Sequence, residues 1–167
     1  SADSASLAFV SLNDTVRLGA TASDANAQTI SGAGASARWS STDAAVAAVD
    51  SITGRVTAKG NGTAQVIARL DSVADTTAVT VSQRLVRFAF SPVNLVLSAL
   101  TYDSVVSVTA LDAGGSALGA GAPAFTTTVT ALSPGVASVT RLTNTTFRVT
   151  SQGNAANPVG VKVVDVV

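Results

Sequence analysis

The chain has 167 residues and a formal net charge of zero, because ten Lys and Arg residues balance ten acidic residues, all of them Asp. It contains no His, Cys or Glu, so most acid–base, nucleophilic and thiolate-metal sites cannot be assembled, and no catalytic activity is predicted. No cluster of Lys and Arg occurs, which argues against a nucleic-acid partner.

The remaining composition favours strands and turns. Apolar residues make up 47% of the chain and aromatic residues only 4%, so Val, Ala, Leu and Ile must build most of the core. Val and Thr favour strands, whereas Asp, Asn, Gly and Ser favour turns, and together they predict an all-β protein. No apolar run reaches the ~18 residues of a membrane-spanning helix, so no transmembrane segment is predicted.

In the first half of the chain, short apolar runs and apolar alternation predict a series of strands. They lie at residues 7–12, 15–22, 35–40, 43–49 (after an initial turn), 56–58, 63–70 and 76–82. Turn signals separate them at residues 23–34, 51–54, 59–62 and 71–75. Strands of ~5–8 residues with turns every ~8–12 residues predict a β-sandwich.

Side-chain alternation also predicts which residues face the core of this sandwich. Residues 15–22 place Val16, Leu18, Ala20 and Ala22 on one face, as a half-buried strand does. The predicted core residues of the first half are Trp39, Val46, Val49, Val56 and Val66. Trp39 is alternatively a platform for sugar stacking, but its neighbours alternate as in a buried strand, which favours the core.

An ordered series of motifs runs through this half of the chain. It reads Trp39-Ser-Ser-x-Asp43, Val46-Ala47-x-Val49, Gly54-x-Val56-x-Ala58-x-Gly60-x-Gly62-Thr63-Ala64 and then Val79-Thr80-Val81. The series resembles the bacterial immunoglobulin-like domain, group 2, over about residues 7–83. The resemblance implies a module found in tandem in intimin- and invasin-type adhesins, surface-layer and cell-wall proteins, and phage tail or capsid proteins. It implies no shared catalytic residues.

The second half repeats the pattern in degenerate form. Residues 104–111 match 16–22, Phe125 stands where Trp39 stood, 132–139 echo 43–49, and 159–167 echo 63–70. The period of ~85–95 residues is that of whole domains. We therefore predict two tandem immunoglobulin-like β-sandwiches, at residues 1–83 and 84–167. Phe125, Val136 and Val139 are the predicted core residues of the second.

No counterpart of residues 76–82 remains in the second copy, so it is predicted to lack its last strand. One interpretation is that the chain continues or has been trimmed. The other is a groove, lined by Val161, Val163 and Val167, that accepts a strand from a partner or a neighbouring copy. Tyr102 is a further candidate contact residue.

Calcium is the metal that fits Asp, Asn and carbonyl ligands. The weak candidates are Asp24, Asn26, Asp71, Asp75 and Asp112. No Asp-x-Asp-x-Asp-Gly loop occurs, and Asp in a turn usually bonds its own backbone. No metal and no cofactor are therefore predicted.

These observations predict a non-catalytic structural or protein-interaction module of a bacterial envelope or surface assembly, acting as a scaffold, spacer or accessory subunit. Its expected partners are other proteins of that assembly, bound by β-edge pairing. The chain contains no Met, so we expect a processed form or part of a longer protein. We expect it in the periplasm or at the cell surface, exported by a signal that this chain does not contain. The alternatives are adhesin-type ligand or carbohydrate binding, and decoration of a phage virion or tail.

Overall fold

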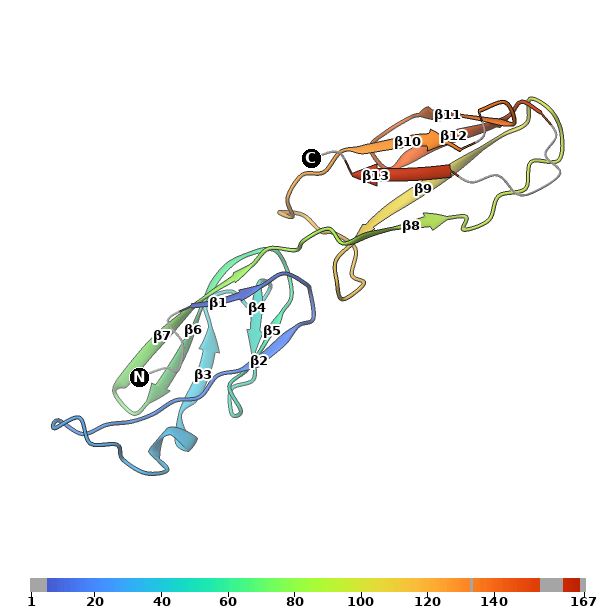
Figure 1. Ribbon diagram of the computed structural model, residues 1–167. Coiled ribbons are helices and arrows are strands. Elements are labelled where there is room, and N and C mark those ends of the chain that lie inside the picture. The colour runs from blue at the N-terminus through green and yellow to red at the C-terminus, as the bar shows by residue number, and fades with distance from the viewer. Residues whose placement is uncertain (1–5, 133, 154–160, 166–167) are drawn as a thin grey trace. The chain divides into compact units, whose positions relative to one another are not determined.

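The computed structural model describes residues 6–132, 134–153 and 161–165, with backbone alone for the last range (Figure 1). The chain divides into two compact units. Unit 1 comprises Ser1–Leu85 and Asp112–Pro123, and unit 2 comprises Val86–Leu111 and Ala124–Val167. The described residues form strands and one short 3₁₀ helix, which confirms the predicted all-β class.

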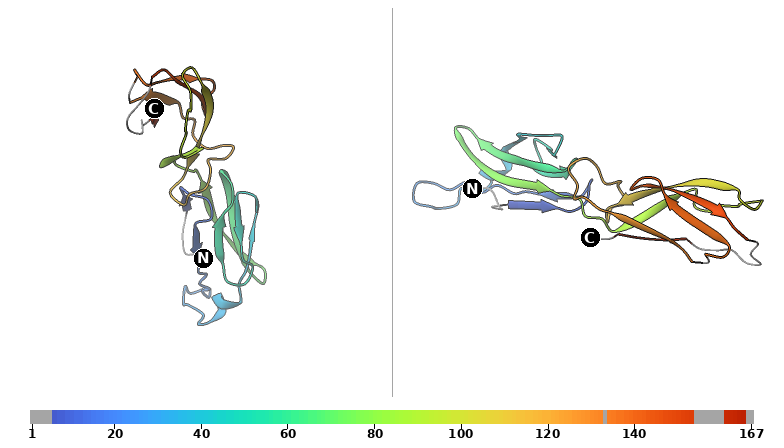
Figure 2. Two further views of the ribbon diagram at one scale, coloured as in Figure 1. Left: turned by 90° about the vertical axis from the view of Figure 1, so that its right-hand side faces the viewer. Right: turned by 90° about the horizontal axis from the view of Figure 1, so that it is seen from above.

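Unit 1 contains two sheets. The first has the order β1-β7-β6-β3, with β1 at Ser6–Phe9, β7 at Val73–Val81, β6 at Gly62–Leu70 and β3 at Arg38–Ser41. The second has the order β2-β5-β4, with β2 at Thr15–Arg17, β5 at Arg55–Ala58 and β4 at Ala47–Val49. The pairing is antiparallel except between β1 and β7. Figure 2 gives two further views of the strands.

The core of unit 1 lies between these sheets and combines small and branched side chains with one indole. Trp39 is 6% exposed, and Val56 and Val66 are fully buried. Val46 and Val49 are partly buried and pack against this cluster. Strand alternation produces the pattern, because successive side chains point to opposite faces of a sheet.

Three predicted strands are shorter than the sequence pattern suggested. The strand predicted at residues 7–12 ends at Phe9. The strand predicted at residues 15–22 ends at Arg17, and Val16 is 38% exposed. Its partner β5 begins at Arg55, directly after the turn at Gly54, so the ladder ends at the Arg17–Arg55 pair. Leu18 still donates its backbone N–H to the Gly54 carbonyl at 3.0 Å and is buried.

The strand predicted at residues 35–40 also begins later. A 3₁₀ helix, η1 (Ala33–Ser36), precedes β3. Since β6 ends at Leu70, and Arg38 already pairs with Arg69, little partner strand remains for earlier residues.

The turn predicted at residues 71–75 is a hairpin turn of two residues. Leu70 pairs with Val73, and Asp71 has a φ of 51°. Strand β7 therefore begins three residues earlier than predicted, and Asp75 lies within it opposite Ala68.

The described strands of unit 2 also form two sheets. The larger has the order β11-β12-β9-β8, with β11 at Ala137–Arg141, β12 at Thr146–Ser151, β9 at Asp103–Leu111 and β8 at Arg87–Ser91. The smaller pairs β10 (Thr127–Ala131) with β13 (Val161–Asp165). All these pairs are antiparallel.

The core of unit 2 is centred on strand residues that the sequence analysis did not single out. Its buried apolar residues are Val108, Ala110, Ala137, Phe147 and Val149. The predicted core residues Phe125, Val136 and Val139 are only partly buried. Phe125 packs against Phe88 with ring centroids 6.1 Å apart.

In unit 2, β10 pairs antiparallel with β13, and in unit 1, β3 pairs antiparallel with β6. In unit 1, β7 occupies the other edge of β6. Among the described residues, no strand pairs with the other edge of β13.

Candidate functional site

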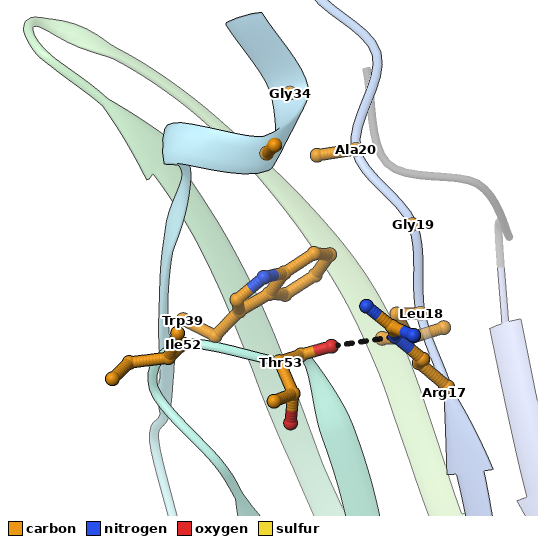
Figure 3. Close-up of a pocket in the computed structure, with 9 residues that line it drawn as sticks. Arg17, Leu18, Gly19, Ala20, Gly34, Trp39, Ile52 and Thr53 are labelled. Atoms are coloured by element: carbon orange, nitrogen blue, oxygen red, sulfur yellow. Dashed lines mark hydrogen bonds between the residues drawn. The ribbon is translucent and has the colours of Figure 1, made fainter. Parts of the chain in front are cut away.

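One end of unit 1 contains a cavity of about 560 Å³. Its lining comes from the end of β2 and the segment after it, from η1, from β3 and from the β4–β5 loop (Figure 3). The lining residues are Arg17, Leu18, Gly19, Ala20, Gly34, Ala35, Trp39, Ile52 and Thr53. Arg17 is the one ionisable side chain in this lining, so the cavity offers binding groups but no general acid or base.

The β4–β5 loop forms one wall of the cavity and is held by Asp50. Asp50 Oδ1 accepts hydrogen bonds from the backbone N–H groups of Ile52 at 3.0 Å and Thr53 at 2.7 Å, and from Thr53 Oγ1 at 2.9 Å. These bonds, led by that from the Thr53 backbone, lower the pKa of Asp50. The Thr53 carbonyl in turn accepts a hydrogen bond from Arg17 Nε at 3.1 Å, which joins the loop to β2 (Figure 3).

Trp39 lies between η1 and the segment that holds Arg17 and Leu18 (Figure 3). It is only 6% exposed and belongs to the core cluster. Sugar stacking requires an open ring face, so the buried position favours the core assignment over the sugar platform.

The calcium candidates are not gathered into one site. Asp24 Oδ1 accepts the backbone N–H groups of Asn26 and Gln28, both at 2.9 Å, and so stabilises its own loop. Asp75 Oδ1 accepts the Thr76 N–H at 2.8 Å from within β7, whereas Asp71 lies in the hairpin turn. Within the described ranges, no group of three or more Asp, Glu, His or Cys side chains is placed to hold a metal ion.

Asp112, the last calcium candidate, is fully buried in unit 1. Its Oδ2 accepts hydrogen bonds from Gln83 Nε2 and the Leu12 backbone N–H, both at 2.9 Å, and its Oδ1 accepts the Ser116 N–H at 2.9 Å. Burial by itself raises the pKa of Asp112, but the bonds from Gln83, Leu12, Ser116 and Gly114 outweigh it, and the pKa is lowered. These donors occupy the positions that a cation would need.

The predicted contact residues all belong to unit 2. Tyr102 is 54% exposed. Val161 pairs with Ala131 and Val163 with Val129 along β13. Val167 lies outside the described residues.

Residues 24–71 match the family model of the intimin immunoglobulin-like domain. Residues 24–71 thus belong to a bacterial immunoglobulin-like domain. The match extends from the loop before η1 to the end of β6, so it includes Trp39, the β4–β5 loop and most of the cavity lining. The group 2 subtype and the tandem repeat of this immunoglobulin-like domain stay predictions.

The chain is also similar to solved structures, at low identity. Domains 4 and 5 of the S-layer protein SbsC share 22% identity and a TM-score of 0.43, over 95% of this chain and 86% of that chain. A fragment of SbsC with domains 1–6 shares 23% identity and a TM-score of 0.41, over 90% of this chain and 21% of that chain. The adhesin InvE of Yersinia pseudotuberculosis shares 14% identity and a TM-score of 0.41, over 98% of this chain and 54% of that chain. These values are too low to transfer a function. No curated protein matches the chain.

Sequence reasoning missed two residues of the immunoglobulin-like domain that hold buried polar contacts. Gln83 is the last residue of the first predicted domain, yet it is fully buried. Asn61, which belongs to a predicted turn, donates from Nδ2 to Gln83 Oε1 at 2.8 Å. No local pattern identifies such contacts, because the partners lie 22 or more positions apart.

Proposed function

We propose that this chain is a non-catalytic structural and protein-interaction module of a bacterial envelope or surface assembly, located outside the cytoplasm. The observation that carries the proposal is the match of residues 24–71 to the intimin immunoglobulin-like domain. Within the described residues, no helix is long and apolar enough to cross a membrane.

Exposed apolar side chains in unit 2 support an interaction role. Val93 and Val96 are 83% and 84% exposed, and Leu100 and Tyr102 are 56% and 54% exposed. All four lie in the segment between β8 and β9. Exposed apolar groups mark interaction surfaces when they gather, and Tyr is enriched in interfaces.

The edge of β13 is a second candidate contact. An edge strand presents backbone N–H and C=O groups to which another strand can add. We infer that such a strand, whether from this chain or from a partner, pairs with β13 as β7 pairs with β6 in unit 1.

Photo-crosslinking in intact cells tests the interaction role. A photoreactive residue replaces Tyr102 in the full chain, and the matched control replaces Asn26, an exposed residue in a loop of unit 1. The proposal predicts a discrete adduct with an envelope protein at position 102 and none at position 26. Recovery of the chain in the cytoplasm, or identical adduct patterns at both positions, would contradict it.

Ligand binding is a second candidate function, and the cavity beside the buried Trp39 is where it can be tested. Trp39 lines it and is the only Trp in the chain, so its fluorescence reports occupancy directly. Titration with oligosaccharides would change the Trp39 emission in the unmodified chain and not in an Arg17→Ala variant. Unchanged emission across a glycan panel would remove carbohydrate binding at this cavity from consideration.

A further inference from the structure

We propose that residues 112–123, here called the strap, complete the immunoglobulin-like domain, which is therefore not finished at Leu85. The strap follows β9 and precedes β10, both strands of unit 2, yet it belongs to unit 1. The stability of unit 1 then depends on the strap, although the strands before and after the strap, β9 and β10, belong to unit 2.

Gln83 is the centre of the contact between the strap and the rest of unit 1. The flanking residues Ser82 and Arg84 donate their backbone N–H groups to Phe9 and Val10 at 2.9 Å, which aligns this stretch with the end of β1. Gln83 itself is fully buried. A buried amide is costly unless its donors and acceptors find partners.

The strap supplies most of those partners. Gln83 Nε2 donates to Asp112 Oδ2 at 2.9 Å and to the Ala117 carbonyl at 3.0 Å. Gln83 Oε1 accepts the Gly119 N–H at 2.9 Å and Asn61 Nδ2 at 2.8 Å. All four hydrogen-bonding positions of the amide are thus filled, three of them by the strap.

Two further groups of unit 1 bind the strap. The Leu12 N–H donates to Asp112 Oδ2 at 2.9 Å, across 100 positions of sequence. Asn61 accepts the Gln83 N–H at 2.6 Å and donates to the Ala120 carbonyl at 3.1 Å. The contacts of the strap therefore reach the segment after β1, the β5–β6 turn and the segment after β7.

The composition of the strap permits this close approach. It reads Asp-Ala-Gly-Gly-Ser-Ala-Leu-Gly-Ala-Gly-Ala-Pro. A Cβ on Gly114 would lie 3.3 Å from the Leu12 carbonyl oxygen, and one on Gly121 would lie 3.2 Å from Asn61 Cβ. Small residues thus let the strap backbone reach the buried amide.

Fluorescence of the full chain gives a direct test, because Trp39 is the only Trp and lies in unit 1. The test variant is Asp112→Asn. In either orientation of the new side-chain amide, its NH₂ group faces N–H donors, either those of Gln83 and Leu12 or that of Ser116. The matched control is Asp24→Asn, the same substitution at an exposed carboxylate that accepts two backbone N–H groups.

We expect Asp112→Asn to lower the midpoint of thermal unfolding, followed by Trp39 fluorescence, by roughly 5–15 °C. The reason is that hydrogen bonds to charged groups are among the stronger ones. The Asp24→Asn midpoint should stay within about 2 °C of the unmodified chain. Equal midpoints for the two variants would overturn the proposal.

If Asp112→Asn does not fold, hydrogen exchange in the unmodified chain tests whether the strap is docked on unit 1. The Leu12 and Gly119 amides donate to Asp112 and Gln83 side chains respectively. A docked strap slows their exchange by at least about 100-fold relative to exposed loop amides. Exchange at the rate of an exposed loop would show that the strap is not docked.

Discussion

Gly54 closes the loop between β4 and β5 with a φ of 68°, a left-handed conformation that residues with a Cβ rarely adopt. A Cβ at this position would lie 2.7 Å from the Leu18 carbonyl oxygen and 2.8 Å from Trp39 Cε2. In a Gly54→Ala variant, the left-handed backbone costs about 1 kcal/mol and the overlap a further 1–3 kcal/mol or so. The variant should therefore lose roughly 2–4 kcal/mol, or about 10–25 °C in the unfolding midpoint of unit 1.

Gly32→Ala is the matched control for this substitution. Gly32 has a φ of 76°, but a Cβ there would meet nothing within 4 Å. The control therefore carries the backbone cost alone, about 1 kcal/mol. Thermal unfolding followed by Trp39 fluorescence compares the two variants. Equal losses would refute the close contact of this loop with Leu18 and Trp39.

Three further predictions concern acid, packing and metal. The lowered pKa of Asp112 contributes stability that is fully present above its unfolded value of about 3.9 and is lost as the pH falls toward the folded value. Asp112→Asn should therefore flatten this acid limb in pH-dependent urea denaturation and leave the contribution of Asp50, whose pKa is also lowered. Val66→Ala, at a fully buried site, should cost about 2–3 kcal/mol in urea denaturation, whereas Val73→Ala, at a site 71% exposed, should change stability by less than about 0.5 kcal/mol. Addition of calcium or of a chelator should leave the calorimetric midpoint within about 1 °C, because the candidate ligands are dispersed; a calcium-dependent rise of several degrees would contradict this placement.

Elements with strong local signals could be predicted from the sequence. The turn and short strand within 43–49, the hairpin loop at 51–54 and the alternation of 63–70 correspond to the observed β4, Gly54 and β6. In each case the information lies within a few residues, as an Asp that caps a turn, a glycine with positive φ or a period of two.

Strand ends could not be predicted in this way, because a partner strand sets them. Strand β2 stops at Arg17 where β5 runs out, although the apolar alternation continues to Ala22. The reverse occurs in β7, which begins at Val73 because a two-residue turn brings it into register with Leu70. The apolar alternation within one strand carries no information about the length of the strand that pairs with it.

The polar contacts of the strap were beyond local reasoning for a related reason. Asp112 has the appearance of an ordinary turn residue, and indeed it accepts the N–H of Ser116 four positions later. Its other carboxylate oxygen accepts from Gln83 and Leu12, which are 29 and 100 positions away. Such contacts depend on the tertiary fold, so a single sequence gives no signal for them.

The side-chain amide of Gln83 gives the most direct test of whether residues 112–123 complete the immunoglobulin-like domain. Nuclear Overhauser spectroscopy of the isotope-labelled full chain can compare this amide with that of Gln28, which is exposed. With the strap docked, we expect cross-peaks from the Gln83 amide protons to Ala117 and Gly119, and none between the strap and the Gln28 amide. A Gln83 amide that shows only exchange with water, as the Gln28 amide is expected to do, would contradict it.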